Sequence, residues 1–199
     1  MTRRKMLLPG HVVELLEVLE RSLTPLQIPY AIGGGVALNA HGYRRHTDDV
    51  DVFIREEDRA LVLRALRVAG LVTATVMSPF MYMAKFPDET DPEIRIDVMV
   101  PAGDPEISAI EMAVRTELPE MGSEIPLFDP EWLALSKFYS NLPEHRRDLQ
   151  KMWELGLFDV REARRRLGLM DPDSAPDFDA ELRSFERKDS GRNRPKRPR

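Results

Sequence analysis

The sequence contains no cysteine, and this absence excludes disulfide bonds and metal sites built on thiolates. A metal ion must therefore be held by oxygen or imidazole ligands, and carboxylates favour magnesium or manganese. The four histidines are scattered, with no H-x-x-x-H spacing of the kind that indicates a zinc site.

The chain also lacks a long uncharged hydrophobic run and a basic overall balance. Glu14, Glu17 and Glu20 interrupt its first apolar segment at helical spacing, so we expect neither an exported signal peptide nor a membrane span, and a cytoplasmic protein. The net charge of −5 does not indicate a surface built for nucleic acid, although residues 192–199 are basic. With 199 residues, 42% of them hydrophobic, the chain is long enough for a sizeable core.

Hydrophobic periodicity predicts a mixed α/β portion followed by helices, which is an α+β fold class. Strands are predicted at residues 30–32, 46–54, 71–77, 80–86, 94–100 and 124–128. Helices are predicted at residues 9–23, 36–41, 56–69, 105–114, 130–139, 142–155 and 159–167. We expect a core at residues 1–128 and a helical part at 129–170.

The segment 171–199 is rich in Pro, Asp, Ser and Arg, which predicts a largely disordered tail. Phe178, Leu182 and Phe185 are spaced by four and three residues, so a short helix that docks on the body or on a partner is the alternative.

Three aspartates are candidate metal ligands. Asp49 and Asp51 lie two residues apart on a predicted strand, so both carboxylates point to the same face. Such a pair repels and raises its pKa values unless a cation lies between the two groups. Asp97, in the alternating strand 94–100, would complete an acidic cluster able to hold metal ions. A lone D-x-D is also typical of solvated strand ends. The metal-site interpretation therefore depends on the co-occurrence of Asp49, Asp51 and Asp97.

A glycine triplet precedes the aspartates. The backbone N–H groups of Gly34 and Gly35, at the start of the predicted helix 36–41, would point their partial positive charge at a phosphate. A glycine triplet by itself is more often only a tight turn.

At this point a family resemblance appears. Residues 30–54 resemble the nucleotidyltransferase superfamily typified by DNA polymerase beta, and within it the minimal bacterial enzymes that include AbiEii-type toxins. The resemblance is carried by Gly34-Gly35-x-Ala37, Gly42 and Arg45-x-Thr47-x-Asp49-x-Asp51. Asp97 matches the third carboxylate of that family, and weaker agreement in order continues to Leu167.

The resemblance implies a nucleotidyltransferase fold, with a short mixed sheet flanked by helices and a helical C-terminal part, that uses Mg²⁺ or Mn²⁺. Its implied catalytic and metal-binding residues are Asp49, Asp51 and Asp97. Its implied nucleotide- and phosphate-binding residues are Gly34, Gly35, Arg45, Thr47 and Lys137. One departure is that Gly35 stands where the family often has serine.

Two of these assignments have alternatives. Lys137 lies among apolar residues of its helix and could equally extend from a core helix to solvent, with Arg147-Asp148 as an ion pair that positions it. Arg45 could contact a phosphate or pair with a neighbouring aspartate, Asp48 or Asp49.

The implied activity is transfer of an NMP from an NTP to a hydroxyl. A tRNA 3′ end is the acceptor that the toxin-like resemblance favours, with the protein as the toxin of a toxin–antitoxin pair and an antitoxin as its partner. A small-molecule acceptor of the aminoglycoside type, or an inactive nucleotide-binding or partner-binding module, is the alternative. No membrane partner is expected.

Overall fold

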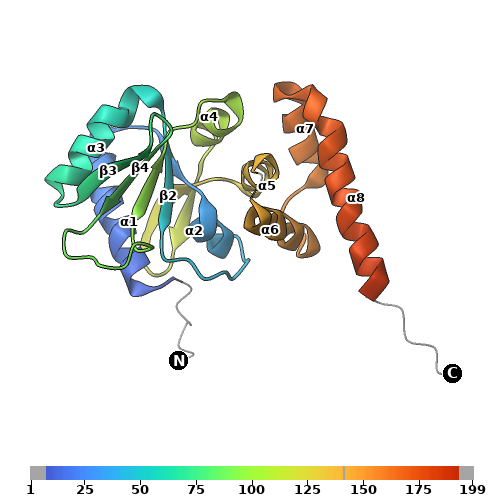
Figure 1. Ribbon diagram of the computed structural model, residues 1–199, viewed down its shortest axis with the longest axis horizontal. Coiled ribbons are helices and arrows are strands. Elements are labelled where there is room, and N and C mark those ends of the chain that lie inside the picture. Colours follow the sequence, from blue (N-terminus) through green and yellow to red (C-terminus); the bar gives the residue numbers. More distant parts are fainter. Residues whose placement is uncertain (1–7, 141, 193–199) are drawn as a thin grey trace. The chain divides into compact units, whose positions relative to one another are not determined.

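The computed structural model describes residues 8–140 and 142–192, which Figure 1 traces in chain order. The chain divides into two compact units, Met1–Leu133 and Ala134–Arg199, with the boundary inside one helix. The first unit contains the sheet, and the second consists of helices. The division at residues 128 and 170 that we expected from the sequence stays a prediction.

The first unit contains a seven-stranded mixed sheet in the order β3-β4-β5-β2-β1-β7-β6. Strand β2 is parallel to β5 and β1 is parallel to β7, whereas the other neighbours are antiparallel. The strands are β1 (Tyr30–Ile32), β2 (Val50–Ile54), β3 (Val72–Met77), β4 (Met81–Lys85), β5 (Ile96–Met99), β6 (Val114–Leu118) and β7 (Ser123–Leu127). The predicted α+β class with a mixed sheet is confirmed.

Most element bounds differ from the sequence prediction by a few residues, and three strands deserve a physical explanation. Strand β2 begins at Val50 instead of residue 46. The loop before it is held by side-chain hydrogen bonds and does not pair with a neighbouring strand. Strand β5 is shorter than predicted at both ends. Strand β6 was not predicted, because the helical pattern extended to Val114, whereas the helix ends at Glu111 and a hairpin follows.

One face of the sheet packs against helices. Val50, Val52, Ile96 and Val98 are fully buried in a core shared with α1 and α3. The helices of this unit are α1 (Gly10–Leu23), α2 (Gly34–Ala40), α3 (Arg59–Val68) and α4 (Asp104–Glu111), with 3₁₀ turns η1 (Thr24–Leu26) and η2 (Glu56–Asp58). Each fully buried aliphatic side chain contributes about 1.5–3 kcal/mol, so this layer fixes which side chains of β2 and β5 face away from it.

The second unit corrects the prediction of a disordered tail. Its helices are α5 (Pro130–Tyr139, which crosses the boundary), α6 (Pro143–Glu154), α7 (Val160–Met170) and α8 (Ala175–Arg192), with the 3₁₀ turn η3 (Pro172–Ser174). In α8, Phe178 lies 5.1 Å from Phe138 and Phe185 lies 6.0 Å from Trp153, measured between ring centroids. Packing of these aromatic side chains therefore holds α8 in place, although most of its residues are polar or charged. Residues 193–199 lie outside the described range.

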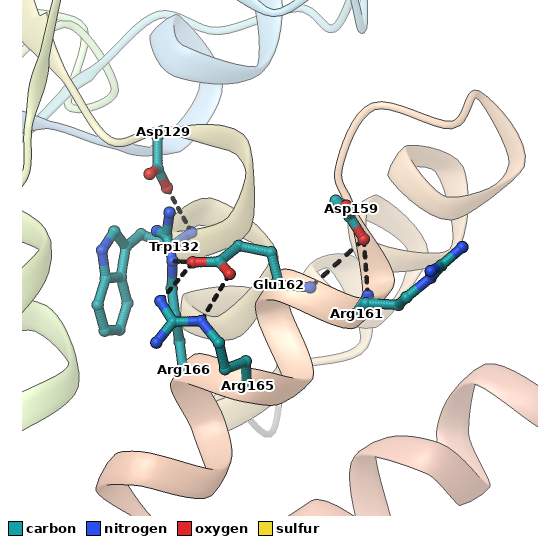
Figure 2. Close-up of polar contacts among 7 residues, drawn as sticks. All are labelled: Asp129, Trp132, Asp159, Arg161, Glu162, Arg165 and Arg166. Carbon is teal, nitrogen blue, oxygen red and sulfur yellow. Dashed lines mark hydrogen bonds and ion pairs between the residues drawn. The ribbon is translucent and has the colours of Figure 1, made fainter.

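Carboxylates fix two of the helix starts (Figure 2). The Asp129 carboxylate accepts a hydrogen bond from the backbone N–H of Trp132 at 2.8 Å and so caps the N-terminus of α5. Asp159 accepts from the N–H groups of Arg161 and Glu162 at the start of α7. Hydrogen bonds from Arg165 and then Arg166 lower the pKa of Glu162 to about 2, so this first turn keeps its negative charge into the acidic range.

No helix in the described part of the chain is long and apolar enough to cross a membrane.

Truncating the core side of α8 tests whether this helix is anchored. We expect Phe178→Ala to lower the free energy of unfolding of the second unit by about 3–5 kcal/mol, because a fully buried ring is replaced by a cavity. Amide hydrogen exchange along α8, combined with urea denaturation, measures the effect. Arg183→Ala, on the exposed side of the same helix, is the matched control. Equal protection in both variants would mean that α8 does not depend on this contact.

Candidate metal centre

Three aspartates come together on the sheet face opposite the helical core. Asp51 of β2 and Asp97 of β5 are register partners on adjacent parallel strands, and Asp49 lies immediately before β2. One carboxylate oxygen from each lies within 4.8 Å of the others, and Asp97 is only 3% exposed. Within the part of the chain that the structure describes, this is the one group of three or more such residues close enough to share an ion.

Arg95 partly neutralises the cluster. Its guanidinium donates to both oxygens of Asp97, from Nε at 2.7 Å and from an NH₂ group at 3.1 Å. Burial nevertheless raises the pKa of Asp97, and the nearby Asp49 charge adds to this, whereas the Arg95 contact opposes it. Arg95 was not among the residues assigned from sequence, although its position two residues before Asp97 on the same strand face was a usable signal.

The glycine turn touches the carboxylates directly. Gly34 has a φ of +53°, and a Cβ there would lie 1.7 Å from Oδ2 of Asp51, so only glycine fits. The N–H of Gly33 donates to the Asp51 carbonyl at 2.9 Å. The ladder of α2 begins with the Ala37 N–H, which donates to the Gly33 carbonyl, so the N–H groups of Gly34 and Gly35 precede it.

Thr47 links Gly35 to the aspartate cluster. A Cβ at Gly35 would lie 2.3 Å from Oγ1 of Thr47, so this hydroxyl fills the space that a side chain at residue 35 would need. The same hydroxyl donates to Oδ1 of Asp49 at 3.0 Å. Thr47 therefore orients Asp49 and brings a hydroxyl beside Gly35, where the sequence resemblance had suggested that one was missing.

Asn39, a residue that the sequence analysis did not select, clamps the loop to the glycine helix. Its side chain is 3% exposed, and its Nδ2 donates to the carbonyls of Gly35 at 2.8 Å and Arg45 at 2.6 Å. Its Oδ1 accepts from the Arg45 N–H at 3.2 Å. A polar residue four positions after Gly35 in an apolar helix was the available signal. This amide replaces strand pairing and fixes the approach to Thr47 and Asp49.

A second tether holds the same loop to α1. Asp48 contacts Nε2 of His11 at 3.0 Å with one oxygen and Nε2 of His46 at 2.8 Å with the other. His11 is distant in sequence, so only the tertiary structure brings it here. The carboxylate of Asp48, one of the two partners considered for Arg45, is thus engaged by histidines.

Lys137 belongs to the second unit. Its Nζ lies 3.6 Å from Oδ2 of Asp148, and both side chains are 5% exposed. We expected an Arg147-Asp148 ion pair that positions Lys137, and in the structure Asp148 contacts the lysine directly. A buried charge pair of this kind is costly to break, because the remaining charge has no partner. The contact of Lys137 with a phosphate stays a prediction.

These features define the class of fold. An antiparallel β1–β2 pair connected through a glycine-led helix, with β5 parallel to β2 and aspartates on both strands, is the nucleotidyltransferase fold. Solved structures confirm this assignment. No family model matches the chain, and no curated protein matches it in sequence.

Three solved structures of this fold resemble the chain over most of its length. The crystal structure of ANT(2'')-Ia in complex with adenylyl-2''-tobramycin has a TM-score of 0.52 at 16% identity, covering 88% of this chain and 97% of the other. The solution structure of the same antibiotic-resistance factor gives 0.50 at 17%, covering 90% and 93%. An antigenic nucleotidyltransferase-like protein from Paracoccidioides brasiliensis gives 0.52 at 21%, covering 88% and 94%.

Changing the Asn39 amide to an acid tests the clamp. We expect Asn39→Asp to lower the free energy of unfolding by about 3 kcal/mol, because a carboxylate would face the two carbonyls that Nδ2 now satisfies. Urea denaturation measures this change, and Gln27→Glu, an exposed amide-to-acid substitution, is the control. Equal midpoints for the two variants would contradict the clamp.

Proposed function

We propose that this protein is a Mg²⁺-dependent nucleotidyltransferase that moves an NMP from an NTP to a hydroxyl acceptor. The observation that carries this proposal is the convergence of three carboxylates within 4.8 Å of one another beside a glycine turn, on the nucleotidyltransferase fold.

The donor set fits a small hard cation. Oxygen ligands about 2.1 Å from Mg²⁺ lie about 3–4 Å apart, which is compatible with the spacing of the three aspartates. Three carboxylates facing one guanidinium leave a net negative charge that a divalent ion would neutralise. When bound, the ion supplies Lewis-acid stabilisation of phosphate charge. Asp49, Asp51 and Asp97 would hold it.

The chain's own residues account for the remaining requirements of the reaction. The N–H groups of Gly34 and Gly35 would bind the triphosphate next to Asp51. The acceptor oxygen forms a bond to the α-phosphorus while the bond from that phosphorus to the bridging oxygen breaks and pyrophosphate leaves. The hydroxyl proton would pass to Asp97, the carboxylate on the strand next to Asp51. Arg45 and Lys137 are further candidate phosphate contacts.

A small molecule is the acceptor that the structural neighbours support. ANT(2'')-Ia, an antibiotic-resistance factor, is seen in complex with adenylyl-2''-tobramycin. A tRNA 3′ end as acceptor, and an antitoxin as partner, have support from the sequence resemblance alone.

Removing a metal ligand tests the reaction itself. We expect Asp51→Asn to lower transfer of label from α-³²P-NTPs by about 10³-fold or more, because the substitution removes one negative ligand of the ion at nearly constant volume. Asp88→Asn, in an exposed loop, is the matched control. Circular dichroism checks the fold of both variants. Undiminished transfer by Asp51→Asn would rule out the proposed site.

An acceptor comparison tests the substrate class. We expect labelled product with small hydroxyl compounds and little label on total tRNA, because the chain is acidic overall. Preferential labelling of tRNA would instead support the RNA acceptor. Mg²⁺-dependent NTP binding with no product from any acceptor would support the inactive nucleotide-binding module.

A further inference from the structure

The sheet face that carries the carboxylates also carries methionines. Residues paired directly across neighbouring strands point to the same face of a sheet. One row across β2, β5, β4 and β3 contains Asp51, Asp97, Met83 and Ala74. The next row contains Phe53, Met99, Met81 and Met77. The acidic cluster therefore adjoins an apolar surface on the same face, made of Met81, Met83 and Met99, which we name the methionine surface.

This surface is not part of the core. The alternate residues of the same strands, among them Ile96, Val98 and Ala84, are fully buried on the helical side. Met81, Met83 and Met99 are only half-buried, and Met77 at the sheet edge is 60% exposed. Unbranched, polarisable methionine side chains adapt their shape to apolar ligands. Three methionines beside the aspartate cluster offer apolar contact area to a ligand and need no hydrogen-bond partners.

The geometry of phosphoryl transfer assigns a direction to the site. The attacking and leaving oxygens lie on opposite sides of the phosphorus. Gly34 touches Asp51 on one side of the cluster, so a triphosphate held there would release its pyrophosphate on the glycine side. The attacking hydroxyl would then come from the side of Asp97 and β4, where Met83 is the next residue in the row.

We infer that the methionine surface binds the acceptor, and that the acceptor is a small molecule with an apolar or planar body joined to the reacting hydroxyl. This inference rests on the proposed function.

Charge on the same face supports this choice of ligand. Arg95, beside Asp97, is engaged with that carboxylate through two hydrogen bonds. Lys85, at the end of β4, donates to the Glu89 carbonyl at 3.0 Å. The methionine surface itself carries no charge, so a polyanionic backbone would gain little from it.

The test compares two sugars that present the same ring hydroxyl groups and differ in their apolar part. Full-length protein labelled with ¹³C at the methionine methyls is saturated with Mg²⁺ and α,β-methylene-ATP, which cannot release pyrophosphate. It is then titrated with 4-nitrophenyl β-D-glucopyranoside or with methyl β-D-glucopyranoside. Met81→Leu, Met83→Leu and Met99→Leu assign the three methyl signals.

We expect the nitrophenyl sugar to shift the Met81 and Met83 signals and to bind at least about fivefold more tightly than the methyl sugar. Met83→Gln, close in size but polar, should remove most of that difference, whereas Leu61→Gln on exposed α3 should leave it unchanged. Equal binding of both sugars, or shifts confined to other methionines, would overturn the inference.

This experiment involves no turnover, so it separates the surface from the reaction. Methyl shifts in a protein that transfers no label would support the methionine surface and count against the proposed function. Label transfer without methyl shifts would do the reverse. Shifts of Met83 produced equally by the trinucleotide CCA would also overturn the choice of a small acceptor.

Discussion

The register between the parallel strands β2 and β5 is the constraint on which the candidate site depends. It sets Asp51 opposite Asp97, and the backbone hydrogen bonds of the sheet keep the two carboxylates at neighbouring positions despite their repulsion. The buried valines and isoleucine on the other side prevent a one-residue slip, since a slip would expose them and bury the aspartates. Hydrophobic burial therefore stabilises an arrangement in which carboxylates repel one another, and a bound cation would relieve that repulsion.

Close packing around the glycines completes this arrangement. Gly34 and Gly35 leave room for Asp51 and Thr47, and neither position could carry a side chain without displacing a neighbour. Asn39 and the His11–Asp48 contact fix the loop that carries Thr47 and Asp49, although that loop belongs to no strand. A loop held by side-chain hydrogen bonds can place a ligand as firmly as a strand does, provided that the groups are buried and satisfied.

Much of the fold was accessible from sequence where periodicity was strong. The alternation around Asp97 correctly predicted that Ile96 and Val98 are buried on the sheet face opposite to Asp97. The glycine triplet correctly indicated a turn close to the aspartates. Prediction failed where composition outweighed pattern. Helix α8 looked disordered because its charges and prolines dominate the average, while Phe178 and Phe185 become decisive only when partners cover them. Strand β6 was missed because the helical pattern of the preceding segment extends to its first residue, Val114, and only pairing with β7 defines the strand.

The sequence by itself limited the donor chemistry: without cysteine, a metal ion could be held only by oxygen or imidazole ligands, and the paired aspartates favoured oxygen. The glycine triplet also determined where the chain next to the aspartates carries no side chain. Only the tertiary structure decided that Asp97 lies beside Asp51, that Arg95 and Asn39 support the cluster, and that methionines from three strands share its face. The physical reason is that strand pairing and loop clamping are long-range contacts, and no local pattern specifies which strands become neighbours.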